Sequence, residues 1–280
     1  MIIGILGEGS ADKRVAITPE HIATLKALKA EKILVEAGAG TAASYPDADY
    51  TAKGAEITSR QQVISQSQIL IKIHALNDEE LAACKGKVLI GGFNPLSNTA
   101  FVKACQAAGV TAFSLDVIPR TTRAQAMDIL SSMATVAGYK AVLTAATHLP
   151  KFFPMFMTAA GTITPAKVVI LGAGVAGLQA IATAKRLGAV VEASEHAGKA
   201  DVVICTAQIP GRKAPILLLK ETVANMKPGS VIIDLAASTG GNCEVTENGK
   251  TIVVNGVTII GESNLQATMP YDASKMFGKN

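Results

Sequence analysis

The sequence predicts an α/β fold made of two Rossmann-like domains with mostly parallel sheets, joined by a long helix, with a cleft between them. Its 280 residues exceed the usual size of one domain. Short β-branched runs alternate with helical stretches from the first residue, and a second such series follows an Ala- and Met-rich stretch. Apolar residues make up 49% of the chain, enough to form a core in each domain.

The first series begins at the amino terminus. Helices are expected to open at Thr18-Pro19, Asn77-Asp78 and Asn94-Pro95, where a capping residue precedes a proline or an acid. Strand–helix alternation of this kind favours a parallel sheet covered by helices on both faces. The predicted strands lie at 2–6, 33–36, 69–73, 88–90 and 110–113.

A stretch rich in Ala, Met and Leu, without proline, predicts one long helix over 123–147. This helix is expected to connect the domains, which are predicted as 1–122 plus 263–280 and as 123–262. The second series has predicted strands at 167–171, 189–193, 202–206 and 230–235, and a helix at 178–187.

Charge, cysteines and histidines exclude several classes of protein. The net charge of +4 is spread without a dense basic run, so neither nucleic acid nor an anionic membrane is a predicted partner. The four cysteines are far apart and outside CxxC pairs, as in reduced, intracellular proteins. The first residues lack the basic flank of a signal peptide, and no apolar run approaches the roughly 18 to 20 residues of a bilayer helix. We therefore expect a soluble chain, and the scattered histidines predict no metal site.

A glycine-rich turn at residues 172–177 follows an apolar strand and opens a helix. Glycines permit a tight turn and close approach of the backbone to a pyrophosphate, and the helix amino terminus offers unpaired N–H groups to its charge. The turn therefore predicts dinucleotide binding; the alternative is a tight strand–helix turn without a ligand. The residues expected at the pyrophosphate are Gly172, Gly174, Val175, Ala176 and Gly177.

Acidic residues follow the next predicted strand. Glu192 and Glu195 lie roughly 20 residues beyond the first glycine, where an acid can bind the ribose hydroxyls. Because an acid there would repel a 2′-phosphate, NAD(H) is the predicted cofactor rather than NADP(H).

The connection after this strand is too short for the predicted topology. Only residues 194–200 precede the next strand, whereas a parallel crossover needs on the order of 10 to 12 residues or more. We therefore expect that the sequence joins the two sides of a break, through an engineered deletion or the omission of a mobile segment. Glu195 would then belong to the far side of that break.

Many segments of the chain closely resemble domain I, the NAD(H)-binding component, of proton-translocating NAD(P) transhydrogenase, a relative of alanine dehydrogenase. The resemblance covers nearly the whole chain. Its most specific segments are 13–19, 119–132, 158–161, 172–188, 206–215, 227–236 and 240–243.

The resemblance implies that Arg120, Gln125 and Asp128 form a loop beside the nicotinamide and hold the ring and its carboxamide for hydride transfer. The residues alone favour equally a structural interpretation, with Arg120 as a loop charge and Gln125 and Asp128 as a solvated first helical turn. Gln125 and Asp128 would share a helix face, which agrees with the role that the resemblance implies. The segment 206–211, at the end of a strand, is expected to bind the cofactor or to be only a turn. The remaining expected cofactor residues are Thr206, Ala207, Gln208 and, for the ribose, Glu195.

In the family, NADH gives hydride to NADP⁺ on another component, and a membrane domain couples this Si-specific/Re-specific reaction to proton translocation. The resemblance therefore implies a homodimer, a partner component that holds NADP(H), and membrane components. These partners would place the chain at the cytoplasmic or matrix face of the inner membrane.

Two alternatives stay open. An alanine dehydrogenase needs a group for acid–base chemistry, and relatives of that kind carry a His and an Asp where this chain has Asn94 and Ser238. Arg14 and Lys72 are shared by both families and do not discriminate. The second alternative is a module that binds NAD(H) without turnover, because of the missing segment after Ala193.

Overall fold

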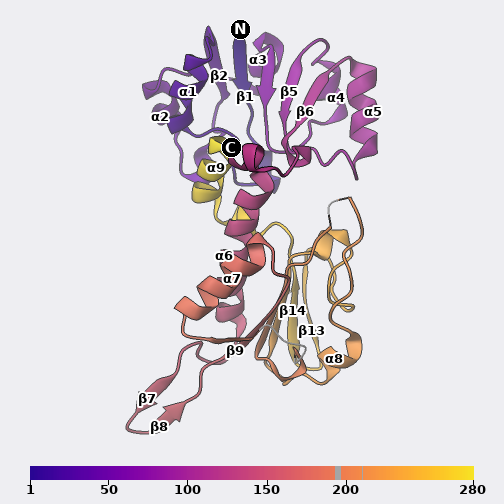
Figure 1. The fold of residues 1–280 in the computed structure, drawn as a ribbon. Helices are drawn as coiled ribbons and strands as arrows, with labels where there is room; N and C mark the ends of the chain where they lie inside the picture. The colour runs from indigo at the N-terminus through magenta and orange to yellow at the C-terminus, as the bar shows by residue number, and fades with distance from the viewer. Residues whose placement is uncertain (193–196, 210) are drawn as a thin grey trace. The chain divides into compact units, whose positions relative to one another are not determined.

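The computed structural model describes residues 1–192, 197–209 and 211–280, which form two compact units (Figure 1). Unit 1 comprises Met1–Met133 and Ala267–Asn280, and unit 2 comprises Ala134–Gln266. The unit boundary falls within the long helix α6 (Ile129–His148), as expected for a connecting helix. The domain bounds derived from the sequence stay a prediction.

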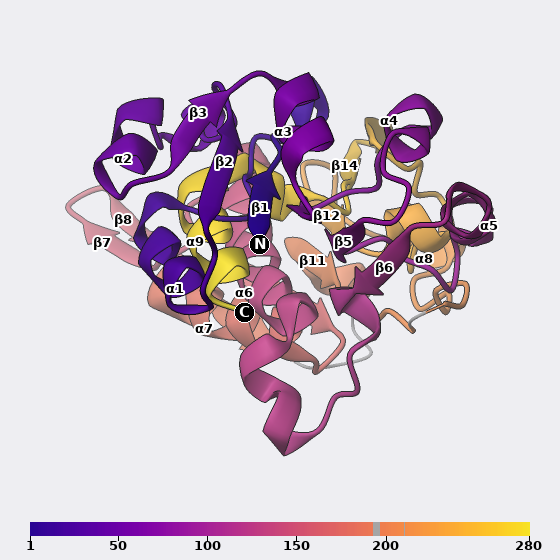
Figure 2. The ribbon, with the colours of Figure 1, turned by 90° about the horizontal axis from the view of Figure 1, so that it is seen from above.

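Unit 1 holds a six-stranded sheet in which every pairing is parallel, in the order β3-β2-β1-β4-β5-β6 (Figure 2). The order reverses beside β1, as in a doubly wound fold. Its strands are β1 (Ile2–Ile5), β2 (Lys32–Glu36), β3 (Glu56–Thr58), β4 (Ile69–Ile71), β5 (Val88–Gly91) and β6 (Thr111–Ser114). Its helices are α1 (Ile22–Ala27), α2 (Asp47–Ala52), α3 (Arg60–Gln66), α4 (Asp78–Ala82), α5 (Thr99–Ala108) and α9 (Pro270–Lys279).

Unit 2 holds a second six-stranded sheet in the order β10-β9-β11-β12-β14-β13, parallel except for the β13–β14 pair. Its strands are β9 (Lys167–Leu171), β10 (Val190–Glu192), β11 (Val202–Cys205), β12 (Val231–Asp234), β13 (Lys250–Val254) and β14 (Val257–Gly261). Its helices besides α6 are α7 (Val175–Arg186) and α8 (Lys220–Ala224). Strands β7 (Phe156–Thr158) and β8 (Gly161–Ile163) form a separate antiparallel hairpin.

The sheet of unit 2 is buried on both faces. Val168 and Ile170 belong to a cluster with Ala141 of α6 and Ala180 of α7, whereas Val169, between them in β9, belongs to the cluster on the opposite face. Side chains of successive strand residues point to opposite faces. The continuous apolar runs that predicted these strands therefore reflect burial on two sides.

The two sheets differ at one edge. In unit 1, β3 pairs with the outer side of β2, whereas in unit 2 the corresponding strand β10 is the edge of the sheet. The order β10-β9-β11-β12 otherwise repeats the order β2-β1-β4-β5. Only residues 193–201 lie between β10 and β11 in the chain, whereas residues 37–68, which include β3, lie between β2 and β4.

Two helix predictions are wrong in detail. The helix predicted over 123–147 is divided, because a 3-10 helix covers Thr122–Met127 and Asp128, at φ −83° and ψ 85°, separates it from α6. Asn94 does not open a helix, because it adopts a left-handed conformation with φ +51°. Helix α5 begins only after Asn98, whose side chain accepts a hydrogen bond from Phe101 N.

The expectation that no segment has the length and composition of a membrane span is also wrong. Helix α6 has 20 residues and a mean hydropathy of 1.3, so it is long and apolar enough to cross a membrane. Its residues Ala141, Val142 and Ala145 are buried in the core of unit 2, however. A buried core helix passes the same test of length and composition as a membrane-spanning helix.

The centre and the edge of the second sheet allow a matched test of this packing. Val203 of β11 is 0% exposed and pairs with Val169 and Ile232, whereas Val190 of β10 is 44% exposed. We expect Val203→Ala to reduce the free energy of unfolding by about 2 kcal/mol and Val190→Ala by less than about 0.5 kcal/mol, measured by urea denaturation. Equal losses would contradict the assignment of β10 to the sheet edge.

Candidate functional site

The glycine turn of unit 2 depends on close backbone packing. Gly172 follows β9 with φ +117°, and a Cβ there would lie 2.4 Å from Thr206 Oγ1. A Cβ on Gly177 would lie 1.9 Å from the Gly172 carbonyl oxygen. Neither position therefore accepts a side chain without movement of the backbone.

The middle glycine has a different environment. Gly174 is the N-cap of α7, and a Cβ built on it meets no described atom within 4 Å. Its carbonyl accepts the hydrogen bond from Leu178 N that starts the helix. The N–H groups of the first helical turn, from Val175 to Gly177, have no partner within an α-helix. Unpaired donors of this kind, at a helix amino terminus, suit a pyrophosphate.

The loop after β11 lies against this turn. Thr206 Oγ1 donates to the carbonyl oxygens of Leu171 and Gly172, both at 3.3 Å. Ala207 N donates to Asn242 Oδ1 at 3.0 Å, and Gln208 Nε2 donates to the Leu235 carbonyl at 2.9 Å. The structure thus brings together Thr206, Ala207 and Gln208 with the glycine turn, at the carboxyl edge of the sheet where α/β folds bind ligands.

Two polar residues behind this loop were missed from the sequence. Asp234 ends β12 and Asn242 follows it in the chain, and both are fully buried. Asn242 lies within a segment that resembles the family, but its neighbours in the sequence predict no role for it. A polar residue at the carboxyl end of a strand was the available signal.

Of the two acids predicted to bind the ribose, Glu192 lies within the described residues and Glu195 does not. Glu192 is the last residue of β10 and is half-buried, and in register it pairs with Val169 of the strand that leads into the glycine turn. Its position at the end of the second strand suits contact with a ribose. Glu195 lies outside the described residues.

In unit 1, Arg120 and Asp128 contact each other. Arg120 Nε donates to Asp128 Oδ2 at 3.3 Å, and Arg120 Nη2 donates to Ser131 Oγ at 2.8 Å. Gln125 lies on the preceding 3-10 helix with its side chain exposed, so Gln125 and Asp128 do not share an α-helical face as predicted.

Asp128 also caps α6. Its Oδ1 accepts from Ser131 N at 2.9 Å and its Oδ2 from Ser131 Oγ at 2.6 Å. Burial by itself would raise the pKa of this carboxyl, but the Ser131 hydrogen bonds and the Arg120 charge outweigh burial and hold the pKa below its ordinary value. Asp128 is therefore ionised at neutral pH, in a position where a helix amino terminus favours negative charge.

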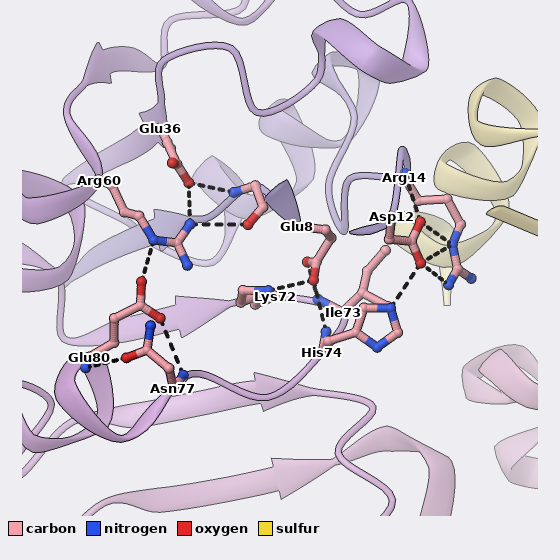
Figure 3. Close-up of polar contacts among 11 residues, drawn as sticks. Glu8, Asp12, Arg14, Glu36, Arg60, Lys72, Ile73, His74, Asn77 and Glu80 are labelled. Carbon is pink, nitrogen blue, oxygen red and sulfur yellow. Dashed lines mark hydrogen bonds and ion pairs between the residues drawn. The ribbon is translucent and has the colours of Figure 1, made fainter. Parts of the chain in front are cut away.

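Arg14 and Lys72 are already paired with acids inside unit 1 (Figure 3). The Arg14 guanidinium contacts both carboxylate oxygens of Asp12, and Lys72 Nζ lies 2.6 Å from Glu8 Oε2. His74 Nε2 also lies 2.8 Å from Asp12 Oδ2. Because these acids balance the two cations, the arrangement favours a structural role for both.

A second cluster in Figure 3 links the loops at the carboxyl edge of the first sheet. Arg60, the first residue of α3, donates to Glu36 at 2.7 Å and to Glu80 at 2.5 Å, and also to the Gly7 carbonyl at 3.1 Å. Glu80 forms a capping box with Asn77 at the start of α4, which confirms the helix start predicted there. These contacts stabilise unit 1 without leaving an unpaired charge on Arg60.

Comparisons with known proteins agree over both units. A family model described as the alanine dehydrogenase/PNT N-terminal domain matches residues 4–137, and one described as the alanine dehydrogenase/PNT C-terminal domain matches 141–197 and 192–280. An NAD(P) transhydrogenase subunit alpha chain of Rhodospirillum rubrum is 41% identical, over 96% of this chain and 85% of the relative. Alanine dehydrogenase of Mycolicibacterium smegmatis is 30% identical, over 96% of this chain and 82% of the relative.

Solved structures give the same result. The crystal structure of transhydrogenase from Sinorhizobium meliloti has a TM-score of 0.96 at 40% identity, covering 100% of this chain and 91% of that chain. A structure of L-alanine dehydrogenase has a TM-score of 0.88 at 24% identity and covers 99% of this chain and 86% of its own, which shows the shared fold.

One alignment also shows that a relative is longer over the matched region. The alignment with an NAD(P) transhydrogenase subunit alpha chain of Rickettsia prowazekii is 334 residues long and includes all 280 residues of this chain, which leaves 54 positions without a counterpart. The two segments matched by the C-terminal model meet at residues 192–197. The shortened connection between β10 and β11 falls at this junction.

The glycine turn predicts a contrast between two substitutions. Gly174→Ala should leave the free energy of unfolding within about 1 kcal/mol of wild type, because its Cβ meets open space, yet should weaken binding of a dinucleotide. Gly177→Ala should destabilise the protein itself, because its Cβ would overlap the Gly172 carbonyl. Thermal unfolding and NADH titration of both variants check this contrast; unchanged NADH affinity in Gly174→Ala would contradict the assigned cradle.

Asp128 predicts a pH dependence of stability. Because its pKa in the folded protein lies below the ordinary value of 3.8, its contribution is fully present above that value and is lost as the pH falls through the lower, folded pKa. We expect Asp128→Asn to be less stable than wild type at about pH 6, and the difference to shrink toward about pH 2. Urea unfolding at both pH values measures it, and a difference that is constant or grows in acid would disprove the interpretation.

Proposed function

Because the chain belongs to the alanine dehydrogenase/PNT family, we propose that it is the NAD(H)-binding component of a proton-translocating NAD(P) transhydrogenase. In this role, NADH bound to the chain gives hydride to NADP⁺ held on a partner component. The observation that carries the proposal is the glycine turn, with its open space at Gly174 and the donors of α7 behind it. The names of the Rhodospirillum and Sinorhizobium relatives support it.

We assign each group of residues a separate task. In unit 2, the backbone from Gly172 to Gly177 holds the pyrophosphate, and Thr206, Ala207 and Gln208 form a wall of the cofactor site. In unit 1, Arg120, Gln125 and Asp128 bind the nicotinamide and its carboxamide. The contact of Asp128 with Arg120 and Ser131 fixes two of these groups before a ligand arrives, which supports a positioning role.

The reaction places few demands on side-chain chemistry. NADH supplies the hydride when bound, so transfer between two nicotinamides needs alignment and exclusion of water but no acid or base from the protein. Asn94 and Ser238, where alanine dehydrogenases carry a His and an Asp, cannot move protons at neutral pH. This difference argues against an amino-acid oxidoreductase.

The direct test is hydride exchange in a reconstituted mixture. The chain is combined with a separately produced NADP(H)-binding component of a transhydrogenase, and reduction of an NADP⁺ analogue by NADH is followed by absorbance. We expect exchange that requires both proteins. NADH binding without exchange would instead favour the module without turnover, a second function supported by the 54 positions that this chain lacks.

Residues that align the nicotinamide should affect rate more than affinity. We expect Gln125→Asn to slow hydride transfer about a hundredfold, since a displacement of about 1 Å has such an effect, while the Kd for NADH changes little. Gln106→Asn, the same change on the exposed face of α5, is the control. Equal losses of rate and affinity would rule out the aligning role.

We further propose that the chain forms a homodimer through the hairpin of β7 and β8. All six residues of these strands are exposed, and Phe156 faces Ile163 across the pair. A hollow of about 500 Å³, lined by Phe152, Pro154 and Leu187 among others, is an apolar surface that the hairpin of a second copy could enter. In the intact enzyme, partner subunits would hold this dimer at the membrane.

The hairpin predicts an effect on oligomeric state. Met157 is 77% exposed, and Met157→Asp should convert a dimer into monomers because a buried charge at an interface is costly. Leu28→Asp, at a similarly exposed apolar position in unit 1, should leave the dimer intact. Sedimentation velocity distinguishes the states, and a dimer that survives Met157→Asp would exclude the hairpin as the interface.

A further inference from the structure

The side-chain amide of Asn242 holds both polar backbone groups of Ala207. Asn242 Oδ1 accepts from Ala207 N at 3.0 Å, and Nδ2 donates to the Ala207 carbonyl at 2.9 Å. The second Nδ2 hydrogen reaches the Pro215 carbonyl at 2.8 Å. The side chain is 0% exposed, and both Nδ2 donors and one lone pair of Oδ1 are engaged by the loop that follows β11.

The main chain of Asn242 is held in turn by the sheet. Asp234, the last residue of β12, accepts from Asn242 N at 2.8 Å and from Cys243 N at 2.9 Å. The same carboxylate accepts from Thr246 Oγ1 at 2.8 Å and from Ala236 N at 3.0 Å. The Asn242 carbonyl accepts from Leu217 N and Leu218 N. The amide therefore projects from a rigid support.

Because Ala207 lies at the same edge of the sheet as the glycine turn, the hydrogen bonds that hold it bear on ligand binding. Cys205 at the end of β11 is in register with Leu171 at the end of β9, so Ala207 and the glycine turn leave the sheet at the same edge. Thr206, which lies between Cys205 and Ala207 in the chain, donates to the Gly172 carbonyl. A dinucleotide on the glycine turn would therefore meet a loop whose peptide groups are already oriented.

We propose that Asn242 is a positioning residue that fixes the backbone of Ala207, and with it the Thr206–Gln208 loop, in the conformation that receives NAD(H). This inference rests on the proposed function, because it concerns the same cofactor site. Only an amide combines one acceptor and two donors in the plane that these contacts require. An aspartate has nearly the same shape, but as a carboxylate it directs lone pairs at the carbonyls of Ala207 and Pro215.

The test compares changes at Asn242 with a control at the other end of β12. Asn242→Asp removes both donors, and Asn242→Ser is a smaller second variant in case the aspartate prevents folding. In Ser230→Ala, the protein loses another buried side-chain hydrogen bond, from Ser230 Oγ to the Ala200 carbonyl, far along the strand from Ala207. Each variant is measured well below its unfolding temperature.

We expect both Asn242 variants to raise the Kd and the KM for NADH about tenfold or more, with a smaller change in kcat, and to speed hydrogen exchange of the Ala207 amide. Ser230→Ala should lose stability and keep wild-type values for all of these. Unchanged NADH binding in the Asn242 variants, with wild type binding normally, would overturn this inference alone. Failure of wild type to bind NADH would instead overturn the proposed function, and this inference with it.

Discussion

The candidate site depends on how closely the backbone at the start of α7 approaches the end of β9. A Cβ on Gly177 would lie 1.9 Å from the Gly172 carbonyl, and one on Gly172 would lie 2.4 Å from Thr206. This close packing directs the first turn of α7 outward from the carboxyl edge of the sheet. It also places the loop of Ala207 beside that turn, where Asn242 and Asp234 hold it. One steric constraint thus determines the position of helix and loop together.

The sequence predicted the regular elements of the fold well, because continuous apolar runs such as 167–171 and 202–205 reflect strands buried on both faces. It missed β3 and the β7–β8 hairpin, whose three-residue strands are too short or too exposed to form a pattern. It also missed the five-residue strands β13 and β14. The glycine turn was predictable because its chemistry is local. The roles of Asn242 and Asp234 were not, because their partners lie up to 35 residues away in the chain. The sequence did not reveal that Asp128 divides the helix predicted over 123–147, because good helix-forming residues lie on both sides of it.

The strand order gives a physical meaning to the shortened connection after β10. The first sheet carries β3 outside β2, and residues 37–68 are enough to build that strand and both crossovers. The relative from Rickettsia has 54 more aligned positions than this chain, which is more than such a unit needs. The short connection after β10 leaves this strand, which carries Glu192, at the edge of the second sheet. The glycine turn, Thr206 and Asn242 all lie on the strands that remain.

Fluorescence titration with NADH and with NADPH, on protein whose intact mass matches the 280 residues, tests most directly whether those remaining strands suffice. Saturable binding of NADH with much weaker binding of NADPH is the predicted result, because in the proposed site the backbone of the turn would hold the pyrophosphate and Glu192 would repel a 2′-phosphate. Absence of NADH binding to a folded chain of the correct mass would contradict the account. It would mean that the glycine turn and the strands beside it do not suffice for a cofactor site.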